Sequence, residues 1–173
     1  VSNSGVVATD TTGVGTARFD LAAAGYGTDK AIFGYGNTGS NSSLTNLVSN
    51  SGVVAADVTG VGTARRVLAA TGYGSTGQAI FAYGYTGSYI SASNLVSNTG
   101  VVATDVTGVG TAREGLGAAR YGGDKAIFAY GHDGSSFNSM SNLVSNSGVI
   151  ASDVSGVGTV RNYLAAVGYS LSA

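Results

Sequence analysis

Residues 94–113 read NLVSNTGVVATDVTGVGTAR, and the same stretch recurs along the chain. Residues 46–65 read NLVSNSGVVAADVTGVGTAR, residues 142–161 read NLVSNSGVIASDVSGVGTVR, and residues 1–18 hold a shortened copy. The Val-Ser-Asn element therefore begins at Val1, Val48, Val96 and Val144. Repetition with a period of about 48 residues is typical of propellers, solenoids and other repeat architectures.

Each unit also holds short apolar runs separated by glycine-rich turns. The element Ala-Ile-Phe-x-Tyr-Gly occurs three times, starting at Ala31, Ala79 and Ala126, so the chain contains three complete units and part of a fourth. We expect four strands in a unit, at residues 68–73, 78–83, 94–103 and 109–113, since no helical apolar period is present. The Asp105–Gly108 stretch between the last two is expected to form a turn in which the aspartate accepts from nearby backbone amides.

The composition excludes several classes of protein. The 173 residues are 43% hydrophobic and 10% charged with a net charge of −1, which argues against disorder and against nucleic-acid binding. The absence of cysteine excludes disulfides and thiolate metal sites. No apolar run approaches the ~18 residues of a membrane span, so no membrane insertion is expected. Because the sequence starts within a repeat, we expect a fragment or a processed piece.

These features predict one all-β domain over residues 1–173, a β-propeller of four-stranded antiparallel blades. The expected boundaries are a partial blade at 1–18, blades at 19–65, 66–113 and 114–161, and a closing strand at 162–173. We expect four blades, with the two termini closing the ring. A larger ring, a ring closed by several chains and a β-solenoid with one coil per repeat are the alternatives.

The order of features resembles kelch-like repeats: an arginine, a small apolar strand, an aromatic strand ending in glycine, and a strand leading to an Asp turn. The family's double glycine corresponds to Tyr35-Gly36, Tyr83-Gly84 and Tyr130-Gly131, but its tryptophan is absent, so no kelch-specific partner follows. The runs quoted above are also similar to repeats in tail or fibre-like proteins of environmental bacteriophages. That resemblance implies a virion-surface or extracellular location and a role in host adhesion.

The repeats differ sharply at two places, directly after the recurring arginine and in the loop between the second and third expected strands. In an antiparallel blade both places lie on one face, whereas the Asp-Gly and Gly-Tyr-Gly turns are expected on the other. Variable loops on a constant scaffold favour recognition, although neutral drift explains the variation equally well. The candidate ligand-binding residues are Phe19, Asp20, Asn37, Asn41, Arg66, Tyr85, Tyr89, Glu114, His132, Asp133, Phe137, Asn162 and Tyr163.

Features present in every repeat are interpreted as structural. They include the Gly-Val-Gly element and an Asp and an Arg eight residues apart, which we expect to join neighbouring strands or blades. These residues are Asp10, Asp57, Asp105, Asp153, Arg18, Arg65, Arg113 and Arg161. An aspartate ring that holds a cation is the less favoured alternative.

No catalytic constellation emerges, since His132 is the only histidine and no distinctive acid pair is present. We therefore predict a non-enzymatic binding module without cofactor or metal. The expected partner is a host-surface glycan or protein, or another copy of the chain. The alternative is a structural spacer of a virion fibre.

Overall fold

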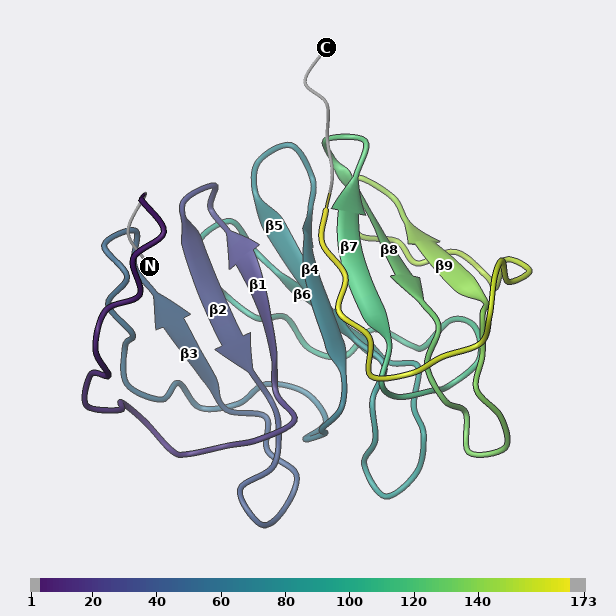
Figure 1. Ribbon diagram of the computed structural model, residues 1–173, viewed down its shortest axis with the longest axis horizontal. Coiled ribbons are helices and arrows are strands. Elements are labelled where there is room, and N and C mark those ends of the chain that lie inside the picture. The colour runs from purple at the N-terminus through teal and green to yellow at the C-terminus, as the bar shows by residue number, and fades with distance from the viewer. Residues whose placement is uncertain (1–3, 169–173) are drawn as a thin grey trace.

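The computed structural model describes residues 4–168, which form an all-β fold (Figure 1). Nine strands make three antiparallel three-stranded sheets, ordered β1-β2-β3, β4-β5-β6 and β7-β8-β9. The strands are β1 Ala22–Tyr26, β2 Lys30–Gly34, β3 Thr45–Val48, β4 Ala69–Tyr73, β5 Gln78–Ala82, β6 Ser93–Val96, β7 Gly117–Tyr121, β8 Lys125–Ala129 and β9 Ser141–Val144. The predicted all-β class is confirmed.

Each sheet is built from one repeat. Within residues 4–168 every strand pairs only with strands of its own repeat, and every pair is antiparallel. A solenoid would instead stack its coils through pairing between successive repeats. The solenoid alternative is therefore not what the described residues form.

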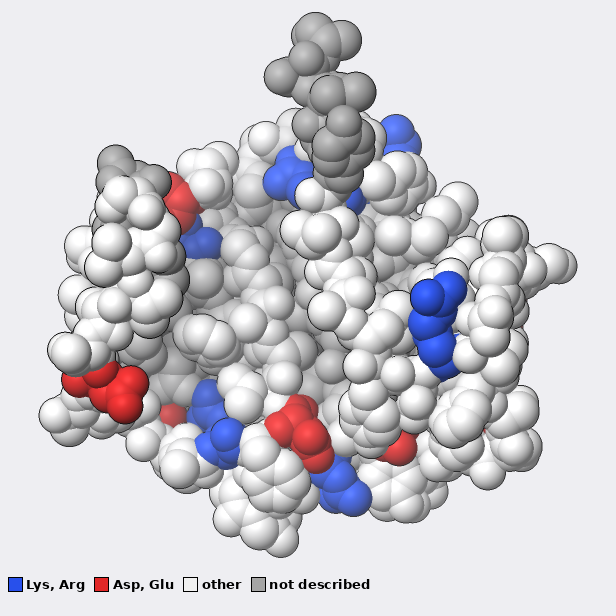
Figure 2. Space-filling model, in the orientation of Figure 1, with Lys and Arg blue, Asp and Glu red and all other residues white. Residues whose placement is uncertain are grey.

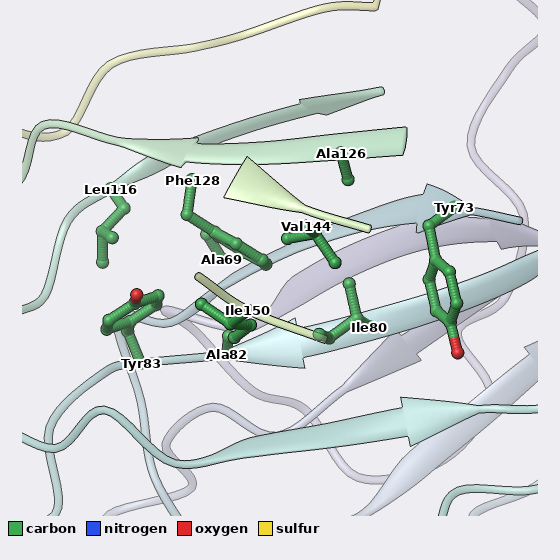
Figure 3. Close-up of a cluster of buried hydrophobic side chains, with 10 residues drawn as sticks. All are labelled: Ala69, Tyr73, Ile80, Ala82, Tyr83, Leu116, Ala126, Phe128, Val144 and Ile150. Carbon is green, nitrogen blue, oxygen red and sulfur yellow. The ribbon is translucent and has the colours of Figure 1, made fainter. Parts of the chain in front are cut away.

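The sheets pack face to face around the aromatic middle strands. Phe81 meets Tyr35 of the first repeat edge-on, with ring centroids 5.1 Å apart, and Phe128 meets Tyr83 in the same way at 5.5 Å. Figure 3 shows the cluster between the second and third sheets, with Ile80 and Phe128 among its side chains. Burial on both sides explains the continuous apolar run of β5, because neither face of that strand meets water.

The first strand of each sheet contacts the first strand of the next sheet. In Figure 1, β1, β4 and β7 are grouped in the middle of the view, and β3 and β9 lie at its two sides. Small residues allow this close approach: a Cβ added at Gly72 would lie 3.3 Å from the carbonyl oxygen of Gly25. The repeats therefore meet along their Ala- and Gly-rich strands.

Backbone hydrogen bonds also link successive repeats just before these strands. Val67 N donates to Asp20 O (2.9 Å), Gly115 N to Val67 O (3.0 Å) and Tyr163 N to Gly115 O (2.9 Å). A pocket of about 250 Å³ lies beside this series, and all four repeats contribute to its wall. Its lining residues are Asp20, Leu21, Val67, Leu68, Gly115, Leu116, Tyr163 and Leu164.

The predicted third and fourth strands are wrong in detail. The third ends at Val96, because Ser97 and the residues up to Gly100 form a turn in which Gly100 adopts a φ of +87°. The chain then returns beside β6 through isolated bridges Val96↔Val102 and Ser93↔Val106. These bridges are three residues apart on β6 and four apart on the returning segment, so a bulge prevents regular pairing.

Residues 109–113, expected as a strand, form none. Each sheet thus has three strands and an irregular fourth edge, in place of the predicted four-stranded blade.

The Asp-Gly segments also lie at a different end from the one predicted. A Cβ at Gly60 would lie 2.0 Å from the hydroxyl of Ser43, and Gly108 and Gly156 approach Ser91 and Ser139 in the same way. These serines belong to the variable loops, so the Asp-Gly segments and the variable loops share one end of the sheets. The extra turn after β3, β6 and β9 is the reason, since it reverses the chain once before the aspartate is reached.

The terminal segments of the described residues border the first and third sheets. Residues 164–168 run beside β7: a Cβ at Gly117 would meet Leu164 and Ala166, and one at Gly168 would lie 2.8 Å from Arg120 O. They form no strand, and residues 169–173 of the predicted closing strand lie outside the described residues. Aligned on the repeat, residues 1–18 correspond to 48–65 and thus to the segment after β3.

Candidate recognition surface

The two variable segments of each repeat are paired with each other. Arg66 N donates to Tyr85 O (3.1 Å) and Tyr85 N to Arg66 O (2.9 Å), and a second bridge joins Tyr85 to Tyr89. The third repeat has the same bridges between Glu114 and His132 and between His132 and Phe137. The first repeat pairs Phe19 with Asn37 and Asn37 with Asn41. In these three repeats the position after the arginine therefore lies beside the loop that varies.

Side chains join these groups across the repeat boundaries. The Arg66 guanidinium donates to Asn41 Oδ1 of the preceding repeat (3.0 Å) and lies 5.0 Å from the centre of the Tyr85 ring. Tyr89 Oη and His132 Nδ1 are 3.2 Å apart, with the two ring centroids separated by 5.8 Å.

Within the loops, Tyr85 stacks edge-on against Tyr89 and His132 tilts against Phe137, each pair at 5.2 Å. The result is a continuous variable row, defined here as Asn41, Arg66, Tyr85, Tyr89, His132 and Phe137.

Exposure differs among the candidate residues. Phe19, Phe137 and Tyr163 are 59%, 51% and 66% exposed, whereas Tyr85, Tyr89 and His132 are half-buried in the row. Asn37 is buried and its Oδ1 accepts from Gly39 N (2.7 Å), so it shapes its loop. The three exposed aromatic rings therefore offer surface for contacts with a partner. The half-buried Tyr85, Tyr89 and His132 mainly contact each other within the row.

The charges near the row are not equivalent. Burial raises the pKa of the Glu114 carboxyl, against the opposing effect of the Arg66 and His132 charges. Hydrogen bonds from Asn138, Ser136 and Ser135 lower the pKa of Asp133 to about 2, so Asp133 is an ionised residue that organises its own loop. Figure 2 shows charged groups of both signs at the lower end of a mostly uncharged surface.

The recurring Asp and Arg form a clamp between repeats. Asp105 accepts from Thr63 N (3.0 Å) and Thr63 Oγ1 (2.6 Å) of the preceding repeat and from Asn94 Nδ2 (2.9 Å). Arg65 is fully buried, lies over the Tyr35 ring at 4.2 Å and donates to Asn94 Oδ1 (2.8 Å) and to Thr63 O (3.2 Å). The prediction that the aspartate binds amides of its own turn is wrong, because the threonine of the preceding repeat occupies it.

The clamp recurs around Arg113 and Asp153, and in part around Arg18 and Asp57. Its asparagine and threonine were not singled out in the sequence, although both recur with the same period as the aspartate. Arg161 is exposed and donates to the Tyr130 hydroxyl. Asp10, the equivalent of Asp57, is exposed. Asn162 is not a clamp residue but the equivalent of Arg66 and Glu114, and it is half-buried.

Within residues 4–168, no three histidine or acidic side chains gather in a way that could hold a metal ion. The same residues contain no helix with the length and hydrophobicity of a membrane span.

Comparison with known proteins found no family model that matches the chain and no curated protein with a similar sequence. The resemblances to kelch-like repeats and to phage fibre repeats stay predictions.

Proposed function

We propose that this chain is a non-enzymatic binding module that recognises a host-surface glycan or protein through its variable surface. That surface consists of the variable row together with the exposed side chains Phe19, Asp20 and Tyr163 and the half-buried Glu114. The observation that carries the proposal is that variable and constant positions of the repeat have different structural places. Variable side chains of three successive repeats contact one another in a continuous row, while the aspartate and arginine of the clamp are the same in every repeat.

We also propose that the three sheets are blades of a β-propeller. Two features support this arrangement: the repeats meet through their first strands, and four successive repeats line one pocket beside those strands. A propeller places corresponding loops of every blade on the same side, which suits a shared recognition surface.

The chemistry of the variable surface favours a target with both apolar and polar groups. Exposed aromatic rings supply rigid apolar area at a low entropy loss, and Arg66, His132 and Asn41 supply donors and acceptors next to them. Both the ring face of a sugar and a protein side chain fit this description. The virion-surface or extracellular setting rests on the resemblance alone.

A structural spacer within a fibre is the second candidate. It is favoured by apolar side chains on the sheet faces at the two ends of the repeat series, where Phe33 is 37% and Leu143 is 40% exposed. A spacer predicts that the variable surface contributes nothing to binding.

The test is the double variant Phe137→Ser, Tyr163→Ser, assayed on glycan arrays and on host cells. The matched control is Val101→Ser, Val149→Ser, since both valines are 65% exposed and lie outside the variable surface. We expect binding to be lost in the first variant and kept in the control, with equal melting temperatures. Unchanged binding by the first variant contradicts the proposal.

A further inference from the structure

The first and third sheets each leave uncovered a face whose equivalents in the other sheets are covered. Phe33 of β2 is 37% exposed, whereas its counterparts Phe81 and Phe128 are fully buried against a tyrosine of the preceding repeat. Tyr130 is half-buried, whereas its counterparts Tyr35 and Tyr83 are fully buried under those phenylalanines. Within the described residues, Phe33 therefore lacks the tyrosine partner that Phe81 and Phe128 have. Tyr130 likewise lacks the phenylalanine partner that Tyr35 and Tyr83 have.

The turns after the third strands show the same pattern. A Cβ at Gly100 would meet Leu47 and Tyr26 of the preceding repeat at 3.0 Å, while one at Gly52 would meet nothing within 4 Å. At the other end of the series, Leu143 is 40% exposed. Two complementary half-interfaces are therefore open, one upstream of the first sheet and one downstream of the third.

Residues 164–168 lie between these two open faces. They run beside β7 as β7 runs beside β4, and Leu164 shares a pocket with Leu21 of the first repeat. β1, β4 and β7 each pair over five residues with a middle strand, but within the described residues no strand is paired with 164–168. Figure 2 shows the surface hollowed between the N-terminal segment and this C-terminal segment.

We propose that this gap binds a β-hairpin with the repeat's own sequence, equivalent to β8 and β9, supplied in trans by a second copy of that sequence. The contact between repeats forms twice in the described residues, and both of its halves are present a third time at this gap. The Phe of the incoming strand packs on Tyr130, over which Arg161 already lies at 4.4 Å, as Arg113 lies over Tyr83 at 4.5 Å. The Tyr after that strand packs on Phe33.

Backbone pairing supplies the rest of the interaction. The edge of residues 164–168 offers amide and carbonyl groups to an added strand, and strand addition combines such hydrogen bonds with pockets for alternate side chains. The site is therefore specific for an extended segment with Ile and Phe next to each other.

The test uses the full chain and a labelled peptide of residues 123–143, which ends before the part of the repeat that residues 1–18 supply. Binding is followed by fluorescence anisotropy. We expect saturable 1:1 binding. A peptide with Phe128→Ser should bind about tenfold or more weakly, because one aromatic side chain is no longer buried. A chain with Tyr130→Ser should lose affinity to a similar extent, while its melting temperature and circular dichroism report whether it is still folded.

The variant Phe33→Ser tests the other side of the gap, because Phe33 lies on another sheet and its side chain is partly exposed. This variant should also bind the peptide more weakly. The variant Val101→Ser, Val149→Ser is the control and should bind the peptide as the unaltered chain does, since both valines are 65% exposed. Absence of saturable binding, or equal affinity for the Phe128→Ser peptide, overturns the proposal. Loss of glycan binding without loss of peptide binding separates this site from the variable surface.

Discussion

Replacing Arg113 by alanine should destabilise the protein far more than the same change at Arg161, although both residues end the same repeated sequence. Arg113 is fully buried, and it donates to Tyr130 O (2.8 Å), Thr111 O (3.0 Å) and Asn142 Oδ1 (2.7 Å). Arg161 is exposed and donates to one hydroxyl at 3.1 Å.

The expected loss in the free energy of unfolding follows from these contacts. Three hydrogen bonds from a charged donor are lost and leave buried acceptors unpaired, while the unfavourable burial of the guanidinium is relieved, giving a net loss of about 3 kcal/mol. For a chain of this length that lowers the melting temperature by roughly 6–12 °C. The Arg161→Ala variant should lose less than about 1 kcal/mol, as is typical of exposed contacts.

Urea titration and thermal unfolding followed by circular dichroism measure both variants side by side. Equal losses at the two positions would refute the assignment of Arg113 to a buried clamp between repeats. A stabilised Arg113→Ala variant would refute it as well, since burial of the charge would then outweigh its hydrogen bonds.

Further variants test other parts of the fold. Gly84→Ala should destabilise more than Gly87→Ala by at least about 1 kcal/mol in urea titration, because both have a positive φ but a Cβ at Gly84 would lie 2.7 Å from a backbone oxygen, against open space at Gly87. Tyr83→Phe removes the hydrogen bond from the hydroxyl to Val109 O (3.2 Å) and should lower the free energy of unfolding by about 1 kcal/mol, with binding as the unchanged control. The folded-state pKa of Asp133, about 2, lies below its unfolded value of about 3.9, so its contribution is present above pH 4 and lost as the pH falls towards 2. The melting temperature of Asp133→Asn should therefore fall less between pH 5 and pH 2, and an identical fall would contradict this role.

Local patterns in the sequence predict much of the fold. The apolar runs gave the first two strands of each sheet, because alternating and continuous apolar segments determine which residues are buried. The meeting of Arg66 with Tyr85 was also predictable, since antiparallel strands bring alternate connections to the same end.

The remaining features depend on contacts between repeats. The partner of Asp105 is Thr63, 42 residues earlier, and no local turn rule points to it. The turn before Gly100 was missed because the sequence Val-Ser-Asn-Thr-Gly-Val-Val has the pattern of one long strand. Only the positive φ of Gly100, which the sequence does not specify, interrupts that strand. The half-burial of Tyr89 arises from His132 of the next repeat, and a single repeat carries no signal for it.

The most direct test of the central claim is a two-dimensional NOE spectrum of the folded chain, read at its single histidine. The variable row predicts cross-peaks from the His132 ring to Phe137 of its own loop and to Tyr89 of the preceding repeat. Cross-peaks to Phe137 alone would mean that the loops of successive repeats are separate, and would contradict a shared recognition surface.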